Sequence, residues 1–221
     1  MENKKSNYKL VIFDLDGTLM NTAPGIFATA NWTMKQLGKP IETDVQQLRK
    51  FVGPPLAECF KVTYDLEDEL IDEACKIYRM KYEESGKHIA TVYDGMEDVL
   101  QSLNSNDLIC SIATNKYQEV ARDMVEEQEL EKYFNLVYGS DHAGTITKGG
   151  IISKIIDELN VDPKDAVMVG DTFSDLNGAS EAGVDFIAVT YGFGFDNESE
   201  LTDDIVSFCP TTKDILNTIY K

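Results

Sequence analysis

Two carboxylates spaced two residues apart follow the first apolar run of this chain, and a glycine comes directly after them. The run spans residues 10–13, and the carboxylates belong to Asp14 and Asp16, followed by Gly17. In extended backbone, residues two apart point to the same side, so the two anions would share one small volume. At about 4 Å and an effective dielectric near 20 their repulsion is roughly 4 kcal/mol, which a cation, a shared proton or a chemical task must offset. The pair therefore predicts a reactive site at the end of a strand, and the simpler alternative is a strand that runs into an Asx-type turn.

The composition narrows the classes of protein to which this chain can belong. With 221 residues, 43% of them hydrophobic and 27% charged, the chain can bury a core and is too apolar to be disordered. A formal net charge of -19 disfavours binding to nucleic acids and to anionic membrane surfaces, which both require clustered Lys and Arg. No apolar stretch has the length of a membrane span and the first residues lack the core of a signal peptide, so we expect a cytoplasmic protein. The 4 cysteines are scattered without a CxxC pair and are expected to be reduced, structural thiols.

Short apolar runs alternate with amphipathic segments along most of the chain. The runs predict strands over residues 8–13, 108–113, 136–138, 166–169 and 186–190. Apolar residues at helical spacing predict helices over residues 96–103, 117–128, 150–160, 174–182 and 213–220. This rhythm predicts an α/β fold, a Rossmann-like doubly wound parallel sheet with helices on both faces.

The rhythm changes between residues 20 and 90. Helical patterns cover residues 26–37, 45–51, 56–62 and 67–84, without a convincing strand. We therefore expect a helical cap domain at 20–90, inserted between a first core segment at 1–19 and a second core segment at 91–221. A turn at residues 93–95 would return the chain to the sheet.

Polar residues stand at the ends of the predicted strands, which is where ligands bind in an open parallel sheet. Thr114 and Asn115 follow the run at 108–113, and Asp171 follows the run at 166–169 with Asp175 close behind. Lys148 stands at the start of a predicted helix, where unpaired amides and the positive end of the dipole suit an anion. Together with the first two aspartates, these residues predict one polar site assembled from several strand ends.

This set of residues resembles the haloacid dehalogenase superfamily, in its phosphatase branch. Asp14-Leu15-Asp16-Gly17-Thr18-Leu19 is similar to the first motif, Ile112-Ala113-Thr114-Asn115 to the second, Lys148 to the third, and Gly170-Asp171-Thr172-Phe173-Ser174-Asp175 to the fourth. The insertion after the first motif is similar to the four-helix cap of that superfamily, so the resemblance covers the whole chain. Within the branch, Thr114-Asn115-Lys116 and the pattern from Gly170 to Gly183 resemble phosphoglycolate phosphatases and their nucleotidase and pyrophosphatase relatives.

The resemblance implies a role for each motif residue in a phosphatase reaction. Asp14 would be the nucleophile that forms an aspartyl-phosphate. Asp16 would carry the proton, first to the leaving alkoxide and then away from the attacking water. Thr114, Asn115 and Lys148 would bind the phosphoryl group.

The resemblance also implies a magnesium ion. Its direct ligands would be Asp14, the Asp16 carbonyl and Asp171, with Asp175 in an outer position. The charge count supports this, because four carboxylates against Lys148 leave three negative charges, which would repel a phosphate dianion. With the ion bound and Asp16 protonated, the formal charge of the site becomes zero.

Residues of the insertion are expected to select the substrate as part of a lid over the site. Arg49, Lys50 and the turn at 53–55 are the candidates for touching the leaving group, and a solvated basic face is the alternative. Lys116 is expected to be a surface residue at the start of a helix. We expect the partner to be a small phosphorylated metabolite, and the protein to be a monomer or a weak homodimer.

Several functions remain open at this point. Phosphoglycolate phosphatases usually have prolines after the third-motif lysine, whereas glycines follow Lys148 here, so a 5′-nucleotidase, a pyrophosphatase and a sugar phosphomutase are alternatives. A non-enzymatic phospho-acceptor module is less well supported, because such a domain needs only about 100 to 150 residues and no insertion. An inactive binding protein is also less well supported, because no motif residue is missing.

Overall fold

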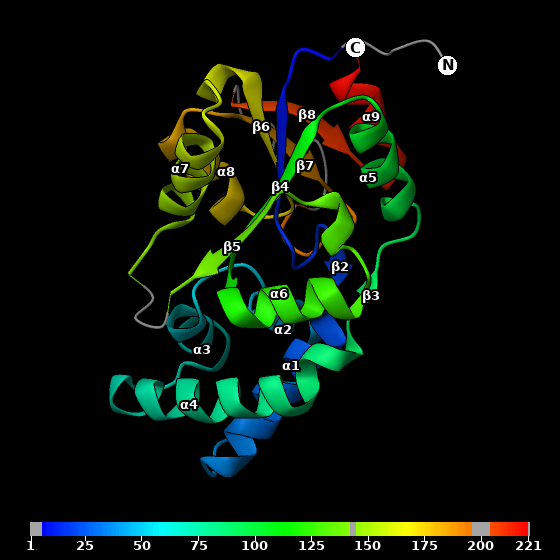
Figure 1. Ribbon diagram of the computed structural model, residues 1–221. Coiled ribbons are helices and arrows are strands. Elements are labelled where there is room, and N and C mark those ends of the chain that lie inside the picture. The colour runs from blue at the N-terminus through cyan, green and yellow to red at the C-terminus, as the bar shows by residue number, and fades with distance from the viewer. Residues whose placement is uncertain (1–5, 142–144, 196–203, 221) are drawn as a thin grey trace.

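Six parallel strands form the central sheet of the computed structural model, which describes residues 6–141, 145–195 and 204–220 (Figure 1). The order across the sheet is β5-β4-β1-β6-β7-β8. The strands are β1 (Leu10–Phe13), β4 (Ile109–Tyr117), β5 (Leu136–Ser140), β6 (Ala166–Gly170), β7 (Asp185–Val189) and β8 (Ile205–Cys209). Every neighbouring pair is parallel, so the carboxyl ends of all six strands lie at the same edge. The α/β fold predicted from the sequence is confirmed.

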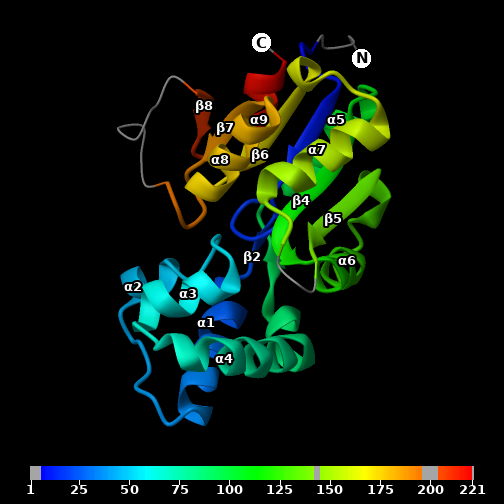
Figure 2. The same ribbon diagram turned by 90° about the vertical axis from the view of Figure 1, so that its left-hand side faces the viewer.

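Helices cover both faces of the sheet, which explains why β1 is apolar at every position (Figures 1 and 2). Val11 and Phe13 face a core shared with α5 (Met96–Ser105), α6 (Gln118–Glu127) and α9 (Thr212–Ile219). Leu10 and Ile12 face the opposite core, against α7 (Lys148–Leu159) and α8 (Phe173–Ala182). Short 3₁₀ turns, η3 (Glu131–Tyr133) and η4 (Pro163–Asp165), precede β5 and β6. Strand β1 is therefore fixed from both sides, and its carboxyl end is a rigid support.

The sixth strand, β8, is absent from the sequence-based prediction. It lies at the edge of the sheet, and its burial pattern is irregular, with Val206 49% exposed between buried Ile205 and partly buried Ser207. An edge strand needs no continuous apolar run, so the pattern of residues 205–209 does not stand out from a loop.

A helical insertion, residues 23–89, lies beyond the carboxyl edge of the sheet (Figure 2). It contains α1 (Ala23–Gln36), α2 (Val45–Arg49), α3 (Leu56–Tyr64), α4 (Asp68–Lys81), the π-helical turn η1 (Tyr82–Gly86) and the 3₁₀ turn η2 (Lys87–Ile89). Two short antiparallel strands, β2 (Met20–Asn21) and β3 (Thr91–Val92), connect it to the sheet. Within residues 20–90, where no convincing strand was expected, β2 is a strand of two residues, which is too short to produce a periodic pattern.

An aromatic cluster forms the centre of the insertion. Phe51 and Phe60 meet edge-on with their ring centroids 4.9 Å apart, and Tyr78 lies 5.5 Å from Phe51. Tyr82 stacks on Tyr78 at 5.5 Å with an interplanar angle of 8°. Because these rings also pack against the core on the first face of the sheet, the insertion and the sheet share one continuous apolar core.

Two expectations drawn from composition can be compared with the structure. All four cysteines are buried as thiols, as predicted. Among the described residues, no helix combines the length and the apolar character that crossing a membrane requires.

The helical stretch predicted over residues 67–84 is present as α4 followed directly by the π-helical turn η1, which ends at Gly86. A close backbone contact lies beside this turn. A Cβ atom on Gly25 of α1 would lie 2.1 Å from the carbonyl oxygen of Gly86 in η1. The two segments can therefore approach only if position 25 has no side chain.

We expect Gly25→Ala to destabilise the protein by about 1–3 kcal/mol, because the added methyl group forces α1 away from η1. At a helix position with free space around it, replacing glycine by alanine would instead stabilise the helix by up to about 1 kcal/mol. Urea unfolding of the two proteins measures the difference. A variant as stable as the wild type, or more stable, would contradict this packing.

Candidate active site

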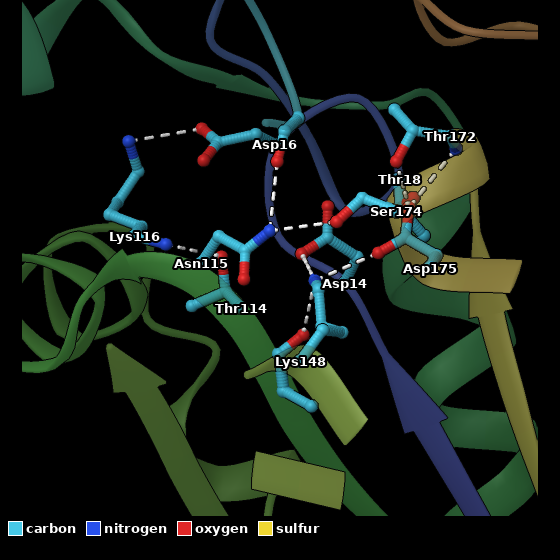
Figure 3. A network of polar contacts seen from close by, with 12 residues as sticks. Asp14, Asp16, Thr18, Thr114, Asn115, Lys116, Lys148, Thr172, Ser174 and Asp175 are labelled. Atoms are coloured by element: carbon cyan, nitrogen blue, oxygen red, sulfur yellow. Dashed lines mark hydrogen bonds and ion pairs between the residues drawn. The ribbon is translucent and has the colours of Figure 1, made fainter. Parts of the chain in front are cut away.

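The motif residues converge at the carboxyl edge of the sheet (Figure 3). Asp14 directly follows β1 and Asp171 directly follows β6. Thr114 and Asn115 were expected after a strand, but they lie within β4, which continues to Tyr117 through a change of register after Ala113. Lys148 is the first residue of α7, and Asp175 lies in the first turn of α8.

The ammonium group of Lys148 is the centre of this site. Its Nζ lies 2.6 Å from Asp14 Oδ1 and 2.8 Å from Asp175 Oδ1. It also donates a hydrogen bond of 3.0 Å to the carbonyl oxygen of Ala113 in β4. Since the Lys148 side chain is only 5% exposed, these partners replace the water that it loses on folding.

Asp171 and Asp175 are each held by the chain around them. Asp171 Oδ2 accepts a hydrogen bond of 2.7 Å from the N–H of Phe193, and the Thr18 hydroxyl donates to Asp171 Oδ1 at 3.3 Å. Asp175 Oδ2 accepts from the N–H and the hydroxyl of Thr172, which caps α8. Both carboxylates are therefore fixed in direction by groups that the structure supplies.

Three of the carboxylates could together hold a metal ion. One oxygen each from Asp14, Asp171 and Asp175 lies within 4.8 Å of the other two, and all three residues are buried. Oxygen ligands of this kind suit Mg²⁺. Glycines let the backbone close around Asp171, because a Cβ atom would lie 2.2 Å from Asp171 Oδ2 at Gly17, where φ is +82°, and 2.4 Å from it at Gly192.

Burial changes the proton affinity of these groups. Desolvation, together with the charges of Asp175 and Asp16, raises the pKa of Asp14 to about 7, although Lys148 opposes the shift. Desolvation and the neighbouring carboxylates raise the pKa of Asp171 well above its usual range. Burial alone would lower the pKa of Lys148, but Asp14 and Asp175 reverse the effect and raise it. The site therefore carries excess negative charge, which a divalent cation would relieve.

The expectation that Lys116 is a surface residue was wrong. Its side chain is only 9% exposed, and its Nζ lies 3.1 Å from Asp16 Oδ1 (Figure 3). Burial would lower its pKa, but Asp16 and Tyr82 raise it above the ordinary value, so the side chain is a cation. With this second lysine the four carboxylates leave two negative charges, which is the charge of one divalent cation.

The insertion contacts the site through two further side chains. Asn115 donates from Nδ2 to the carbonyl oxygen of Gly53 in the insertion and to the Ser174 hydroxyl, both at 2.9 Å. Arg49 donates from Nε to the carbonyl oxygen of Phe193 and from Nη2 to that of Gly192, both at 3.2 Å. The guanidinium group of Arg49 thus joins the insertion to the loop that holds Asp171.

A cavity of about 570 Å³ lies between the core and the insertion. The core side of its wall includes Asp14, Asp16, Thr114, Asn115 and Lys116. The insertion side is largely apolar or aromatic, and it consists of Ile26, Phe51, Val52, Gly53, Pro54, Pro55, Leu56, Ala57, Cys59, Cys75, Tyr78 and Tyr82 with the polar residues Asp72, Lys76, Arg79 and Glu83. Arg49, expected to bind substrate, does not line this cavity and instead makes the loop contacts described above.

Comparison with known proteins agrees with this arrangement. Residues 11–189 match the family described as haloacid dehalogenase-like hydrolase. This chain belongs to that family. It is 34% identical over 199 residues to a 5′-nucleotidase of Pseudomonas aeruginosa, with 90% of each protein covered. It is 27% identical over 209 residues to a phosphoglycolate phosphatase of Aliivibrio fischeri, with 90% of this chain and 92% of that enzyme covered.

A solved structure supports the same assignment. A haloacid dehalogenase-like hydrolase from Streptococcus pneumoniae superimposes with a TM-score of 0.88 and 31% sequence identity, covering 96% of this chain and 98% of that one. The resemblance inferred from the four motifs is therefore confirmed, together with the fold.

We expect Mg²⁺ to stabilise the folded protein and Asp171→Asn to remove most of this effect. At a hundred-fold excess over its Kd, a bound ion adds about 2.7 kcal/mol to the free energy of unfolding. Thermal unfolding with and without Mg²⁺ measures this as a rise in Tm, with NaCl of equal ionic strength as the control for screening.

Asp165→Asn is the matched control, because Asp165 pairs with Lys9 on the surface, away from the cavity. It should keep the wild-type rise in Tm. Equal rises in the wild type and in Asp171→Asn would show that the ion binds elsewhere.

Proposed function

We propose that this protein is a magnesium-dependent phosphatase that hydrolyses a small phosphomonoester through an aspartyl-phosphate on Asp14. The observation that carries the proposal is the buried group of Asp14, Asp171 and Asp175, in which Lys148 bridges Asp14 and Asp175 and Asp14 also lines a cavity. A hydrolase that acts on a phosphate ester needs a nucleophile, a source of positive charge and a proton carrier in one enclosed volume. The residues described here supply candidates for all three.

The donor set fits Mg²⁺, which binds proteins through one or two carboxylates and keeps some of its ligand positions for substrate and water. Asp14 and Asp171 would be its direct carboxylate ligands, together with the Asp16 carbonyl. Both oxygens of Asp175 already have partners, Lys148 and Thr172, which supports an outer position for that residue. The bound ion would neutralise charge on the phosphoryl oxygens and on Asp14.

In the first step, a carboxylate oxygen of Asp14 forms a bond to phosphorus as the bond to the leaving oxygen breaks. Asp16, which also lines the cavity, gives its proton to that oxygen. The Lys148 ammonium group lies beside the nucleophile, and Thr114 lines the same cavity as Asp14. Both residues stabilise the transferred group.

In the second step, water attacks phosphorus and Asp16 accepts the water's proton. The bond from phosphorus to Asp14 breaks, which releases inorganic phosphate and restores both carboxyl groups. Asp16 therefore ends the cycle protonated, as it began, and no further reactant is required.

The cavity supports an organic leaving group with an apolar or flat body. Its insertion side includes Phe51, Tyr78 and Tyr82, which would contact such a group without needing to pair with charge. A nucleoside 5′-monophosphate fits a volume of about 570 Å³ better than the two-carbon glycolate does. The relative named 5′-nucleotidase supports this candidate, and the relative named phosphoglycolate phosphatase supports the alternative.

Hydrolysis of 4-nitrophenyl phosphate should occur with Mg²⁺ and stop in EDTA. Asp14→Asn should lower kcat by about 10⁴- to 10⁶-fold, the range found when a covalent nucleophile or its partner is removed. Asp165→Asn, the matched surface variant, should keep wild-type activity.

A panel of nucleotides, small phosphomonoesters and pyrophosphate then distinguishes the substrate classes. Full activity in EDTA would reject the role of the metal, and more than a few per cent of activity in Asp14→Asn would reject covalent catalysis.

A further inference from the structure

Lys116 is a buried cation to which the proposed reaction assigns no task. Its Nζ forms an ion pair of 3.1 Å with Asp16 Oδ1. In residues 6–141, 145–195 and 204–220, the Asp16 carboxylate has no other ion pair or hydrogen bond, so its direction depends on Lys116.

Lys116 is in turn held by the insertion. Its Nζ donates a hydrogen bond of 3.1 Å to the Tyr82 hydroxyl and lies 4.3 Å from the centre of the Tyr82 ring. A cation over the face of an aromatic ring is attracted by the negative face of the ring. Tyr82 stacks on Tyr78, so the aromatic cluster of the insertion fixes the position of the ammonium group.

This arrangement connects the insertion to the residue that moves the proton. Asp16 is 9% exposed. Its side chain lines the cavity together with those of Lys116 and Tyr82. If the insertion moved away from the core, Lys116 would lose its contacts with Tyr82. The ammonium group that pairs with Asp16 would then no longer be held in place by the insertion. Proton transfer depends on a donor placed within hydrogen-bond distance of the reacting oxygen, so this loss would act on the chemical step.

We propose that Lys116 is a positioning residue that, braced by Tyr82, holds the Asp16 carboxyl group toward the leaving oxygen while the insertion lies against the core. The proposal rests on the proposed function, since it needs Asp16 to protonate the leaving group as the bond from phosphorus to that oxygen breaks. Lys116 itself forms no bond to the substrate in this scheme.

Two phosphate esters separate this role from a structural one. An alkyl phosphate, such as 2-phosphoglycolate or a nucleoside 5′-monophosphate, has a strongly basic leaving oxygen that requires a proton. In 4-nitrophenyl phosphate the leaving oxygen is a stable anion that departs without one. Rapid-mixing measurements on 4-nitrophenyl phosphate give the rate of the first step as a burst of nitrophenolate.

Lys116→Met should keep the nitrophenolate burst within a few-fold of the wild-type rate. On the alkyl phosphate hydrolysed best by the wild type, it should lower single-turnover cleavage by about 10²-fold, the lower end of general acid catalysis. Because the two esters are compared on one preparation, the ratio of their rates does not depend on how much of the variant is folded.

Three further variants test the parts of the proposal. Tyr82→Phe keeps the ring and removes the hydroxyl, and it should shift the ratio in the same direction by a smaller factor. Asp16→Asn should shift it at least as far as Lys116→Met. Lys154→Met removes another lysine over an aromatic ring, Tyr138, at an exposed position that does not line the cavity, and should leave the ratio unchanged.

Equal losses on the two esters in Lys116→Met would show that Lys116 is merely structural and would overturn the inference. A wild-type ratio in Tyr82→Phe would reject the coupling to the insertion. The proposed function fails separately, if the wild-type protein with Mg²⁺ cleaves neither ester.

Discussion

The ion pairs of Lys148 are the interaction on which the rest of the site depends. One ammonium group, at the first turn of α7, joins Asp14 after β1, Asp175 in α8 and the backbone of β4. The alkyl chain of Lys148 packs against Gly178 of α8, where a Cβ atom would lie 2.5 Å from Lys148 Cγ. Helix α8 can therefore approach α7 this closely only because residue 178 is a glycine. Removing one partner of a buried pair typically costs about 3–5 kcal/mol, because the remaining charge stays buried. The position of the nucleophile and the packing of two helices are therefore set by the same contacts.

These contacts still leave the site short of positive charge. Burial is the main cause of the raised pKa values of Asp14 and Asp171, and the neighbouring carboxylates raise them further. A protein could remove the cost by replacing an aspartate, but the fold instead surrounds Asp171 with a donated N–H, a hydroxyl and two glycines. A buried carboxylate whose direction is fixed by hydrogen bonds in this way is suited to binding a cation.

The insertion completes the site from the other side. Gly53 contacts Asn115 and Tyr82 contacts Lys116, whereas Arg49 contacts the loop whose Phe193 N–H binds Asp171. The cavity has walls from both parts. We propose that the insertion acts as a cap and that its position affects the reaction. The effect passes through Lys116 on one side and through the loop of Gly192 and Phe193 on the other.

The sequence predicted the core of this fold and the motif residues because both depend on local patterns. The continuous apolar run of β1 and the aspartates after it follow directly from burial on two faces and from the end of a strand. The edge strand β8 has no such pattern, and the ribbon of β2 and β3 is too short to have one. The surface position predicted for Lys116 is wrong because the burial of this side chain depends on Tyr82, 34 residues away. Arg49 likewise contacts a loop 144 residues away. Contacts of this kind are set by packing between distant segments, which periodicity does not encode.

A crystal structure with Mg²⁺ and trifluoroberyllate, a mimic of an aspartyl-phosphate, tests the central claim most directly. We expect the beryllium on a carboxylate oxygen of Asp14, the ion bound by Asp14, Asp171 and the Asp16 carbonyl, and Lys148 and Thr114 on the fluorides. Mimic and ion bound away from Asp14, or carboxylates of Asp14 and Asp171 that hold no common ion, would contradict the account.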